Sequence, residues 1–501
     1  MKFYTATKDI THLSADAVVC FAYQGEKDTI YSKELLAMDA LTKGMCLALL
    51  KEEGFTAKLG TVFVIQAQAM VSYKKILVVG LGKEKDLTMH DWQYACAAVA
   101  RQAKKAKIKT IVLPLITRVG MNVAYGAVIG LGLGSYSFLI HKSKETQKEE
   151  HEIQKVTIIS TKRFVKETTQ GIITGVIVTD ATCFARDLVN EPPSITTPGY
   201  LAHVAKSLAR KTKNIRCTVF GKKEMKKLGM NGLLGVAQGS HEEPKFIKLT
   251  YNGGGKKIVT LVGKGITYDS GGLSLKPQSG LETMKCDMAG AATILGIFHA
   301  LSQVKPAINV VGLLAATENM PGGGAIKPGD VVRALNGKTI EIVNTDAEGR
   351  IVLADALSYA EKFVKSDYII DFATLTGACV VALGEDIAGL FTDNETLAER
   401  LLGEATRVGE KLWRMPIAKE YEEQLKSEIA DVRNVSKTRY GGAINGALFL
   451  KEFAPKGTPW VHLDIAGPAF AEKDTTLTPY GGTGFGVQTL LSFISKVGEK
   501  N

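Results

Sequence analysis

The stretch Asn344-Thr-Asp-Ala-Glu-Gly-Arg350 decides the fold and the site that we expect, because it places two acids and an arginine within seven residues. The β-branched run Thr339-Ile-Glu-Ile-Val343 precedes it and predicts a strand. From Ile351 to Ala360, apolar side chains recur at helical spacing. We therefore expect these charged side chains where a strand ends, which is where catalytic groups of α/β folds often lie.

A second group of charged residues follows another predicted strand. The apolar run Ile258-Val-Thr-Leu-Val-Gly263 leads into Lys264-Gly-Ile-Thr-Tyr-Asp-Ser-Gly-Gly272, and Lys276 and Asp287 follow. If these segments converge, their four carboxylates would repel one another and stay partly protonated unless cations lie between them. A site for two divalent metal ions resolves that repulsion. The carboxylates are those of Asp269, Asp287, Asp346 and Glu348.

The alternative is that each acid lies on a surface loop, where most aspartates and glutamates are found. The neighbouring glycines favour the site, because they indicate backbone that turns tightly or approaches another group closely. These glycines are Gly265, Gly271, Gly272 and Gly349.

Three blocks carry a resemblance to a known family. They are Val262-Gly-Lys-Gly-Ile-Thr-Tyr-Asp-Ser-Gly-Gly-Leu-Ser-Leu-Lys-Pro277, Met284-Lys-Cys-Asp-Met-Ala-Gly-Ala-Ala292 and the acid-rich stretch 344–350. The chain resembles the leucyl aminopeptidases, the cytosolic metallopeptidases of family M17. The resemblance extends over residues 180–490 and includes further blocks at 371–377, 441–444, 460–467 and 483–486.

The resemblance implies a dinuclear metal site and assigns its residues. One ion is held by Lys264, Asp269, Asp287 and Glu348, and the other by Asp269, Asp346 and Glu348. Lys276 and Arg350 are the catalytic residues that do not bind metal, and Arg350 holds a bicarbonate that accepts a proton. The residues around the substrate are Met284, Asn344, Thr374, Leu375 and Gly377.

The implied activity is removal of N-terminal residues, with Leu preferred, from peptides by a hydroxide that bridges the two metals. Oxygen ligands with one amine suit Mn²⁺, Zn²⁺, Co²⁺ or Mg²⁺, so the residues leave the choice open. Without the resemblance, the simplest role for Lys264 is a salt bridge to Asp269. His462 lies in an apolar run and is expected in the core.

Composition places the chain among soluble globular proteins, with 45% hydrophobic and 23% charged residues. The N-terminal residues lack the apolar run of a secretory signal. The uncharged stretch 119–140 is diluted by glycines and polar residues, and we interpret it as a buried helix. Seven widely spaced cysteines fit reduced thiols in the cytoplasm.

The pattern of strands and helices predicts an α/β protein with two α/β domains. The N-terminal domain covers 1–165, a linker helix covers 166–190, and the catalytic domain covers 191–501. Strands are expected at 17–21, 60–65, 75–79, 110–113 and 155–159 in the first domain. In the second they are expected at 215–220, 246–251, 257–263, 307–315, 338–343, 368–372 and 460–464, forming a mixed central sheet sandwiched by helices that carries the dinuclear metal site.

The sequence also leaves two alternatives to the aminopeptidase activity, and the resemblance carries an expectation about the assembly. A net charge of +11 permits attraction to nucleic acid, and some relatives bind DNA, so a role as a DNA-binding transcription or recombination accessory protein is the alternative. A catalytically dead scaffold is disfavoured by the intact set of site residues. The resemblance implies a homohexamer, and no membrane association is expected. Departures from the family, such as Gln488 and Asn190-Glu-Pro-Pro193, lie outside the ligand set.

Overall fold

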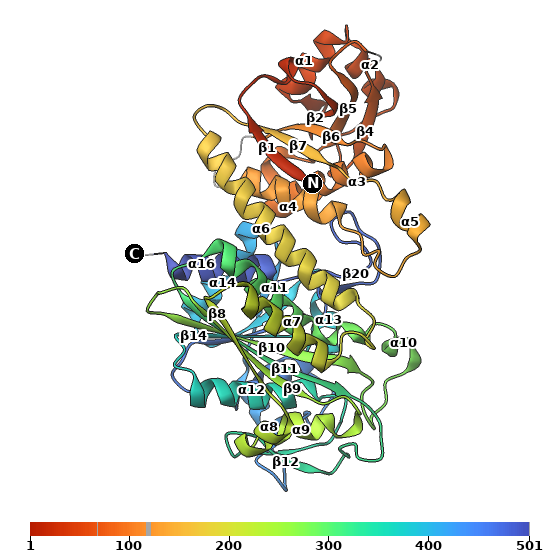
Figure 1. Cartoon of the computed structure of the whole chain (residues 1–501). Helices are drawn as coiled ribbons and strands as arrows, with labels where there is room; N and C mark the ends of the chain where they lie inside the picture. The colour runs from red at the N-terminus through yellow and green to blue at the C-terminus, as the bar shows by residue number, and fades with distance from the viewer. Residues whose placement is uncertain (68, 117–121, 500–501) are drawn as a thin grey trace. The chain divides into compact units, whose positions relative to one another are not determined.

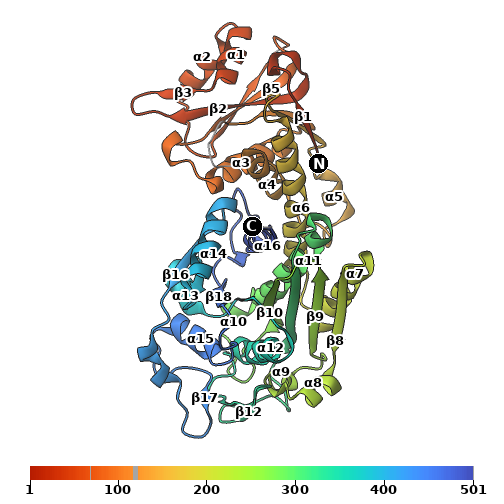
Figure 2. The same cartoon turned by 90° about the vertical axis from the view of Figure 1, so that its left-hand side faces the viewer.

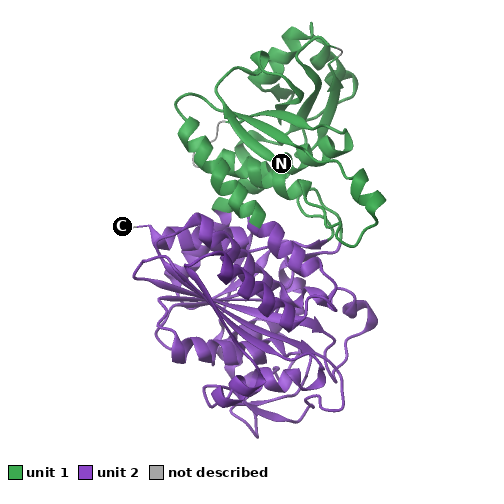
Figure 3. Cartoon of the chain, viewed as in Figure 1, with its two compact units in different colours: residues 1–180, 407–409, 473–480 green, residues 181–406, 410–472, 481–501 purple. Residues whose placement is uncertain are grey.

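The computed structural model describes residues 1–67, 69–116 and 122–499, and the chain divides into two compact units (Figure 3). Unit 1 comprises residues 1–180, 407–409 and 473–480, and unit 2 comprises the remainder. The helix expected over 166–190 is α6 (Val165–Asn190), and the division falls inside it after Asp180. The domain limits predicted from the sequence did not include the two short late segments of unit 1.

Side chains of one helix, α3 (Met89–Lys105), explain why those two segments belong to unit 1. The buried amide of Gln93 donates to the carbonyl of Val408 at 2.7 Å. The guanidinium of Arg101 pairs with the carboxylate of Asp474, with Nη1 2.8 Å from Oδ2. Contacts of this kind join residues more than 300 positions apart, so no local sequence pattern predicts them.

Unit 1 is built on a mixed seven-stranded sheet in the order β1-β7-β6-β2-β5-β4, with β3 paired to β2. All five strands predicted for this region form, and β1 and β3 join them. The strands are β1 (Lys2–Ala6), β2 (Ala15–Gln24), β3 (Thr29–Tyr31), β4 (Val62–Gln66), β5 (Tyr73–Gly80), β6 (Thr110–Pro114) and β7 (Lys155–Ile159). Besides α3, the helices are α1 (Lys33–Leu41), α2 (Met45–Glu52), α4 (Val123–Ser135) and α5 (Lys144–Glu149).

The glycine-rich helix α4 is buried against α3, as the sequence predicted for most of 119–140; residues 119–121 lie outside the described residues. Three of its four glycines, Gly126, Gly130 and Gly134, recur every four residues and form one face. A Cβ at Gly130 would lie 2.2 Å from the carbonyl oxygen of Gln93, and one at Gly134 would lie 2.7 Å from the Cβ of Ala97. The glycines therefore serve close helix packing. Among the described helices, none combines the length and apolar character needed to cross a membrane.

Unit 2 is built on a mixed eight-stranded sheet in the order β16-β15-β18-β14-β10-β11-β9-β8 (Figures 1 and 2). Its centre is parallel, because β18, β14, β10 and β11 run in one direction, whereas β9 and β15 pair antiparallel to β11 and β18. The strands are β8 (Ile215–Phe220), β9 (Lys245–Asn252), β10 (Ile258–Asp269), β11 (Asn309–Asn319), β14 (Tyr368–Ala373), β15 (Ala388–Phe391), β16 (Leu412–Met415) and β18 (Trp460–Asp464).

Helices cover both faces of this sheet, as predicted (Figure 1). A Cβ at Gly263 of β10 would lie 3.0 Å from Ala291 of α11, whereas the adjacent Val262 packs in a cluster with Val352 of α12. Neighbouring strand residues point to opposite faces, so α11 and α12 lie on opposite sides. The helices are α7 (Pro198–Lys211), α11 (Ala289–Val304) and α16 (Val487–Gly498) on one side, and α9 (Asn231–Val236), α12 (Gly349–Phe363) and α15 (Gly442–Lys451) on the other.

The strand expected at 338–343 forms only as β13 (Thr339–Glu341), and it lies outside the central sheet. It is the middle strand of a small sheet with β12 (Val331–Arg333) and β17 (Val432–Arg433). Residues 342–348 then run without regular structure to α12. The acid-rich stretch therefore follows a strand of this small sheet, and the central strands whose ends it meets are β10 and β11.

Candidate metal centre

The centre lies at the carboxyl ends of the parallel strands of unit 2. Lys264 and Asp269 are on β10, and both are buried, with 3% and 2% of their surfaces exposed. Asp287 is on the 3-10 helix η4 (Met284–Met288) that precedes α11. Asp346 and Glu348 lie on the irregular segment before α12. The structure thus brings together all five predicted ligand residues from three separate segments.

Lys264 pairs with two of these carboxylates. Its Nζ lies 2.7 Å from Oδ1 of Asp287 and 3.0 Å from Oε1 of Glu348, and it donates to the carbonyl of Thr374 at 2.9 Å. The salt bridge to Asp269 considered from the sequence is not the one that forms. Burial alone would lower the pKa of Lys264, but the three nearby carboxylates raise that pKa well above its ordinary value.

Lys276 occupies the other side of the cluster. Its Nζ lies 2.8 Å from Oδ2 of Asp269 and 2.7 Å from Oδ1 of Asp346. Burial again opposes the charge of the ammonium, yet Asp269 and Asp346 raise the pKa of Lys276. Each lysine therefore joins a different pair of carboxylates.

The cluster contains four acids and two lysines, and the pKa values of three of the acids lie above their ordinary values. Burial raises the pKa of Asp287 to about 7 although Lys264 opposes the shift, and burial with the charge of Asp269 raises the pKa of Glu348 to about 8. Burial also raises the pKa of Asp346. Four carboxylates near two ammonium groups leave negative charge uncompensated, which is the condition under which cations bind.

The donor atoms fit divalent metal ions. One carboxylate oxygen from each of Asp269, Asp346 and Glu348 lies within 4.8 Å of the others. Within the described residues, Oδ2 of Asp287 and Oε2 of Glu348 are buried without a hydrogen-bond partner. Buried polar atoms normally have partners. These orphaned oxygens are suitably placed to bind a cation.

Arg350 begins the first turn of α12 and is largely buried, with 8% of its surface exposed. Its Nη1 donates to the main-chain carbonyl of Asn434 at 2.8 Å, while its Nε has no hydrogen-bond partner within the described residues. Burial lowers the pKa of Arg350 to about 10, against the attraction of Glu348 and Asp464. A buried guanidinium with an unused N–H group is able to take up a small anion.

Two predicted substrate residues contact the ligand residues directly. Thr374 donates from Oγ1 to Oδ1 of Asp287 at 2.7 Å, and Oδ1 of Asn344 accepts from the main-chain N–H of Asp346 at 2.8 Å. Leu375 is half-buried and its N–H donates to Asp464 at 3.1 Å. Met284 is half-buried on η4, and Gly377 is exposed at the start of α13 (Gly377–Leu383).

Sequence reasoning missed three buried residues that hold the ligand segments. Asn319, the last residue of β11, donates from Nδ2 to Asp269 Oδ1 at 2.8 Å and to the carbonyl of Thr345 at 3.0 Å. Asp464 accepts from both the main chain and the hydroxyl of Thr376. The third is Asn434. Asn319 and Asp464 are the last residues of strands that run parallel to β10. Their position at the ends of predicted strands was the signal that could have identified them as site residues.

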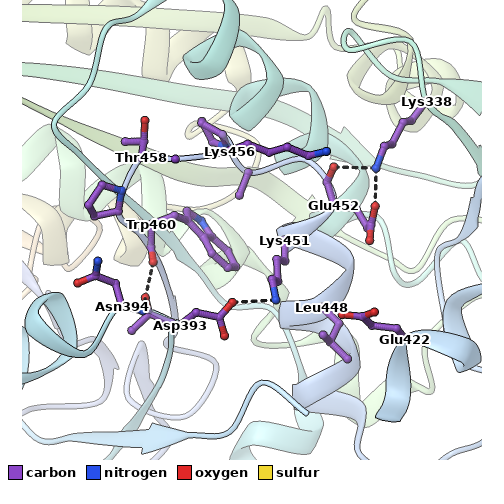
Figure 4. A pocket seen from close by; sticks show the side chains of 15 residues that line it. Lys338, Asp393, Asn394, Glu422, Leu448, Lys451, Glu452, Lys456, Thr458 and Trp460 are labelled. Carbon is purple, nitrogen blue, oxygen red and sulfur yellow. Dashed lines mark hydrogen bonds and ion pairs between the residues drawn. The ribbon is translucent and has the colours of Figure 1, made fainter. Parts of the chain in front are cut away.

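A surface cavity of about 600 Å³ lies elsewhere, at the end of the sheet where β18 begins (Figure 4). Lysines and acids line it, and four of them pair with each other: Lys451 Nζ lies 2.7 Å from Asp393 Oδ2, and Lys338 pairs with Glu452. Since the ligand residues lie at the opposite ends of these strands, this cavity is separate from the metal centre.

Comparison with known proteins agrees with this geometry. Residues 183–491 match the catalytic domain of the cytosol aminopeptidase family, and residues 17–145 match its N-terminal domain. A probable cytosol aminopeptidase of Rippkaea orientalis is 43% identical over 94% of this chain and 95% of the relative, and one of Aquifex aeolicus is 41% identical over 98% and 97%.

Solved structures show the same similarity. The bottromycin maturation enzyme BotP in complex with Mn has a TM-score of 0.85 and 36% identity, covering 97% of this chain and 100% of that one. A mutant of tomato leucine aminopeptidase has a TM-score of 0.89 and 33% identity, covering 99% and 96%. The chain therefore belongs to the cytosol aminopeptidase family and is a metal-dependent aminopeptidase.

Proposed function

We propose that the chain removes N-terminal residues, with Leu preferred, from peptides that have a free N-terminus, and that it uses two divalent metal ions. The observation that carries the proposal is the buried cluster of four carboxylates with two lysines, in which oxygens of Asp287 and Glu348 lack partners among the described residues. The ions are Mn²⁺ or Zn²⁺; the relative that binds Mn favours the first.

The ligands divide between the two ions as follows. Lys264, Asp269, Asp287 and Glu348 hold one ion, and Asp269, Asp346 and Glu348 hold the other. An amine binds metal only when it is deprotonated, so a divalent ion replaces the proton that the carboxylates now retain on Lys264. Metal affinity should consequently rise with pH.

Two ions held by these ligands would supply an activated water and a polarised peptide carbonyl. The chain's own residues supply the rest. Lys276 keeps its proton between Asp269 and Asp346 and provides an ammonium that stabilises negative charge on the reacting oxygen. Arg350, whose Nε has no hydrogen-bond partner among the residues that the structure describes, would hold the bicarbonate proposed as the proton acceptor.

Substrate selection follows from the surroundings of the cluster. Met284 and Leu375 are half-buried and apolar, which suits the side chain of an N-terminal leucine. With two ions bound, the site would favour an α-amine over an acylated nitrogen, because only the neutral amine offers an available lone pair for binding.

The experiment compares Leu-Gly peptides with their N-acetyl forms at equal concentration and saturating Mn²⁺. Acetylation removes the anchor and displaces the scissile carbonyl, and a misplacement of about 1 Å costs on the order of 100-fold in rate. We expect cleavage of the free peptides only. Comparable kcat/KM for both forms would assign the protein to another class of amidase.

A role in binding nucleic acid is the second candidate, and one observation favours it. Residues 206–257 contain thirteen lysines and arginines against three acids, whereas the chain as a whole carries only +11. This segment forms α7, β8, α8 (Lys222–Leu228), α9 and β9 at one edge of the central sheet (Figure 2). Such a concentration of positive charge suits a polyanion.

Fluorescence anisotropy with labelled duplex DNA at increasing salt tests the nucleic-acid role. Replacing Lys222, Lys223, Lys226 and Lys227 on α8 by Glu should weaken binding and flatten its salt dependence. The four lysines at 142, 144, 148 and 155, replaced in the same way, provide a control from unit 1. Equal binding by wild type and both variants would remove this candidate.

The assembly and location are also proposed. The chain forms a homohexamer, for which light scattering should give a mass of about six chains; a fully active monomer would contradict it. A cytoplasmic location fits the seven cysteines, all of which are free thiols, and the name of the relatives.

A further inference from the structure

The segment that carries Asp346 and Glu348 has no regular structure of its own. Residues 342–348 lie between β13 and α12. The main chain of Ile342 bonds to residues 329 and 330, and the carbonyl of Glu348 accepts from the first turn of α12, so the residues between them depend on other partners. Buried main-chain groups need hydrogen bonds. The position of both acids therefore depends on whichever groups supply those bonds.

One buried side chain, Asn434, supplies several of them. Its Oδ1 accepts from the N–H of Val343 at 2.8 Å and from that of Asn344 at 3.3 Å. Its Nδ2 donates to the carbonyl of Asn344 at 2.6 Å and lies 3.5 Å from that of Ala347. Both sides of the amide are thus bonded to the main chain on either side of Asp346.

The main chain of Asn434 fixes two further groups. Its N–H donates to the carbonyl of Glu341, the last residue of β13, at 3.0 Å. Its carbonyl accepts from Nη1 of Arg350 at 2.8 Å. Asn434 follows β17 directly, and β17 pairs with β13 in parallel register, so the small sheet sets where Asn434 stands.

We propose that Asn434 is a positioning residue of the metal centre: its amide sets the distance of Asp346 and Glu348 from the other ligands, while its carbonyl holds Arg350 relative to them. The inference rests on the proposed function of the carboxylates as metal ligands. Its specific content is that the small sheet β12-β13-β17, outside the central sheet, controls the geometry of the centre through one residue.

The two connections can be separated by substitution. Asn434→Ala removes the bonds that the Asn434 side chain makes to the segment and leaves the main-chain bond to Arg350. Loss of groups that orient metal ligands typically costs about 10- to 100-fold in metal affinity or activity. We expect a loss of that size in Mn²⁺ affinity and in kcat at saturating metal, with a smaller change in KM.

Asn434→Asp is the second variant, because it keeps the size of the side chain. It retains both acceptor contacts of Oδ1 but replaces the donor by an oxygen that faces the carbonyl of Asn344 at 2.6 Å. We expect a loss at least as large as that of Asn434→Ala. If Asn434→Ala does not fold, this variant alone decides the question.

The matched control is Asn309→Ala. Asn309 is half-buried and also donates from Nδ2 to a main-chain carbonyl, that of Gly255, at 2.7 Å, but it begins β11 at the opposite end from the ligands. Three quantities are measured for each protein: Mn²⁺ bound at equilibrium dialysis, kcat and KM for Leu-Gly, and Tm. The control should lower Tm alone.

The outcomes separate this inference from the proposed function. Weaker Mn²⁺ binding and lower kcat for the Asn434 variants, with a Tm loss similar to that of the control, support the positioning role. Mn²⁺ affinity and kcat within twofold of wild type would overturn it while leaving the proposed function intact. A wild-type protein that binds no Mn²⁺ would overturn both.

Discussion

Nζ of Lys264 lies 2.7 Å from Oδ1 of Asp287, although one residue is on a central strand and the other precedes a helix. Both side chains are buried. A buried ion pair is costly to form unless further partners compensate, and here Thr374 bonds both members. An amine held among excess carboxylates keeps its proton while no metal is bound, so a divalent ion would have to displace that one proton before the nitrogen could bind it.

Gly349→Ala should disrupt the centre without disturbing the helix. A Cβ at this position would lie 2.5 Å from Cε and 2.6 Å from Nζ of Lys264, so Lys264 would have to move. We predict weaker Mn²⁺ binding and at least a tenfold loss of kcat/KM, in the range seen when metal ligands are misplaced.

Gly403→Ala is the control for this variant. Gly403 lies in α14 (Glu395–Val408), and a Cβ there would meet no atom within 4 Å. Alanine is favoured over glycine inside a helix by roughly 0.5–1 kcal/mol, so this variant should keep its activity and gain slightly in Tm. Full Mn²⁺ affinity in Gly349→Ala would show that Lys264 does not bind metal.

Lys276→Ala should lower kcat by about 100- to 1,000-fold, the size of losing one donor to the reacting oxygen. Metal content should stay near that of wild type, because Lys276 is proposed as an ammonium and not as a ligand. Atomic emission after dialysis gives the metal content. Lys338→Ala, which breaks an ion pair with Glu452 at the separate cavity, provides the control. Loss of metal from Lys276→Ala would place Lys276 among the ligands.

The pair Asp371–His462 makes part of the stability depend on pH. Both residues are fully buried, with His462 Nδ1 2.5 Å from Asp371 Oδ1. Burial alone would lower the pKa of His462, but Asp371 raises it above the ordinary value. Because the pKa of His462 is raised in the folded protein, the stabilisation from this pair is fully present below about pH 6.5, the pKa of a histidine in the unfolded chain. It is lost as pH rises through the higher pKa of His462 in the folded protein.

Asp371→Asn tests the pair. We predict that it lowers Tm more at pH 6 than at pH 9, because breaking a buried charged pair costs about 3–5 kcal/mol only while both members are charged. Differential scanning calorimetry of wild type and variant at the two pH values gives the comparison. An equal loss of Tm at both would show that the protonation of His462 does not change between the two pH values, which contradicts this prediction.

Asp346→Ala and Glu348→Ala should each lose bound metal together with turnover, since each removes a carboxylate from the cluster. Equilibrium dialysis against Mn²⁺ and the rate on Leu-Gly are measured on the same samples. Glu361→Ala, an exposed acid on α12, is the matched control and should resemble wild type. Two tightly bound ions and a wild-type rate in either variant would contradict the ligand assignment.

The sequence predicted that five candidate ligand residues converge, and it predicted most strands of the two large sheets. The structure brings those five residues together, while their role as metal ligands stays a prediction. Lys264 and Asp269 belong to a long apolar strand, whose pattern is local and strong. The acid that forms an ion pair with Lys264 could not be predicted, because whether Lys264 reaches Asp287 or Asp269 depends on how η4 packs against β10. Nor could Asn434, which bonds Arg350 across 84 residues from a short strand without periodicity.

The small sheet illustrates the same limit. Its strands are two or three residues long, too short for an alternating pattern to be recognised. The run 339–343 was predicted as a strand because its residues are β-branched, but the composition of a strand does not identify its neighbours. The sheet to which β13 belongs follows only from long-range pairing with residues 432–433.

The most direct test of the central claim is hydrolysis of leucine p-nitroanilide by the chelated protein before and after addition of Mn²⁺, with metal content measured at each step. The account predicts no hydrolysis once the metal has been removed and recovery of the full rate as two Mn²⁺ ions bind per chain. An undiminished rate in the metal-free protein would contradict it.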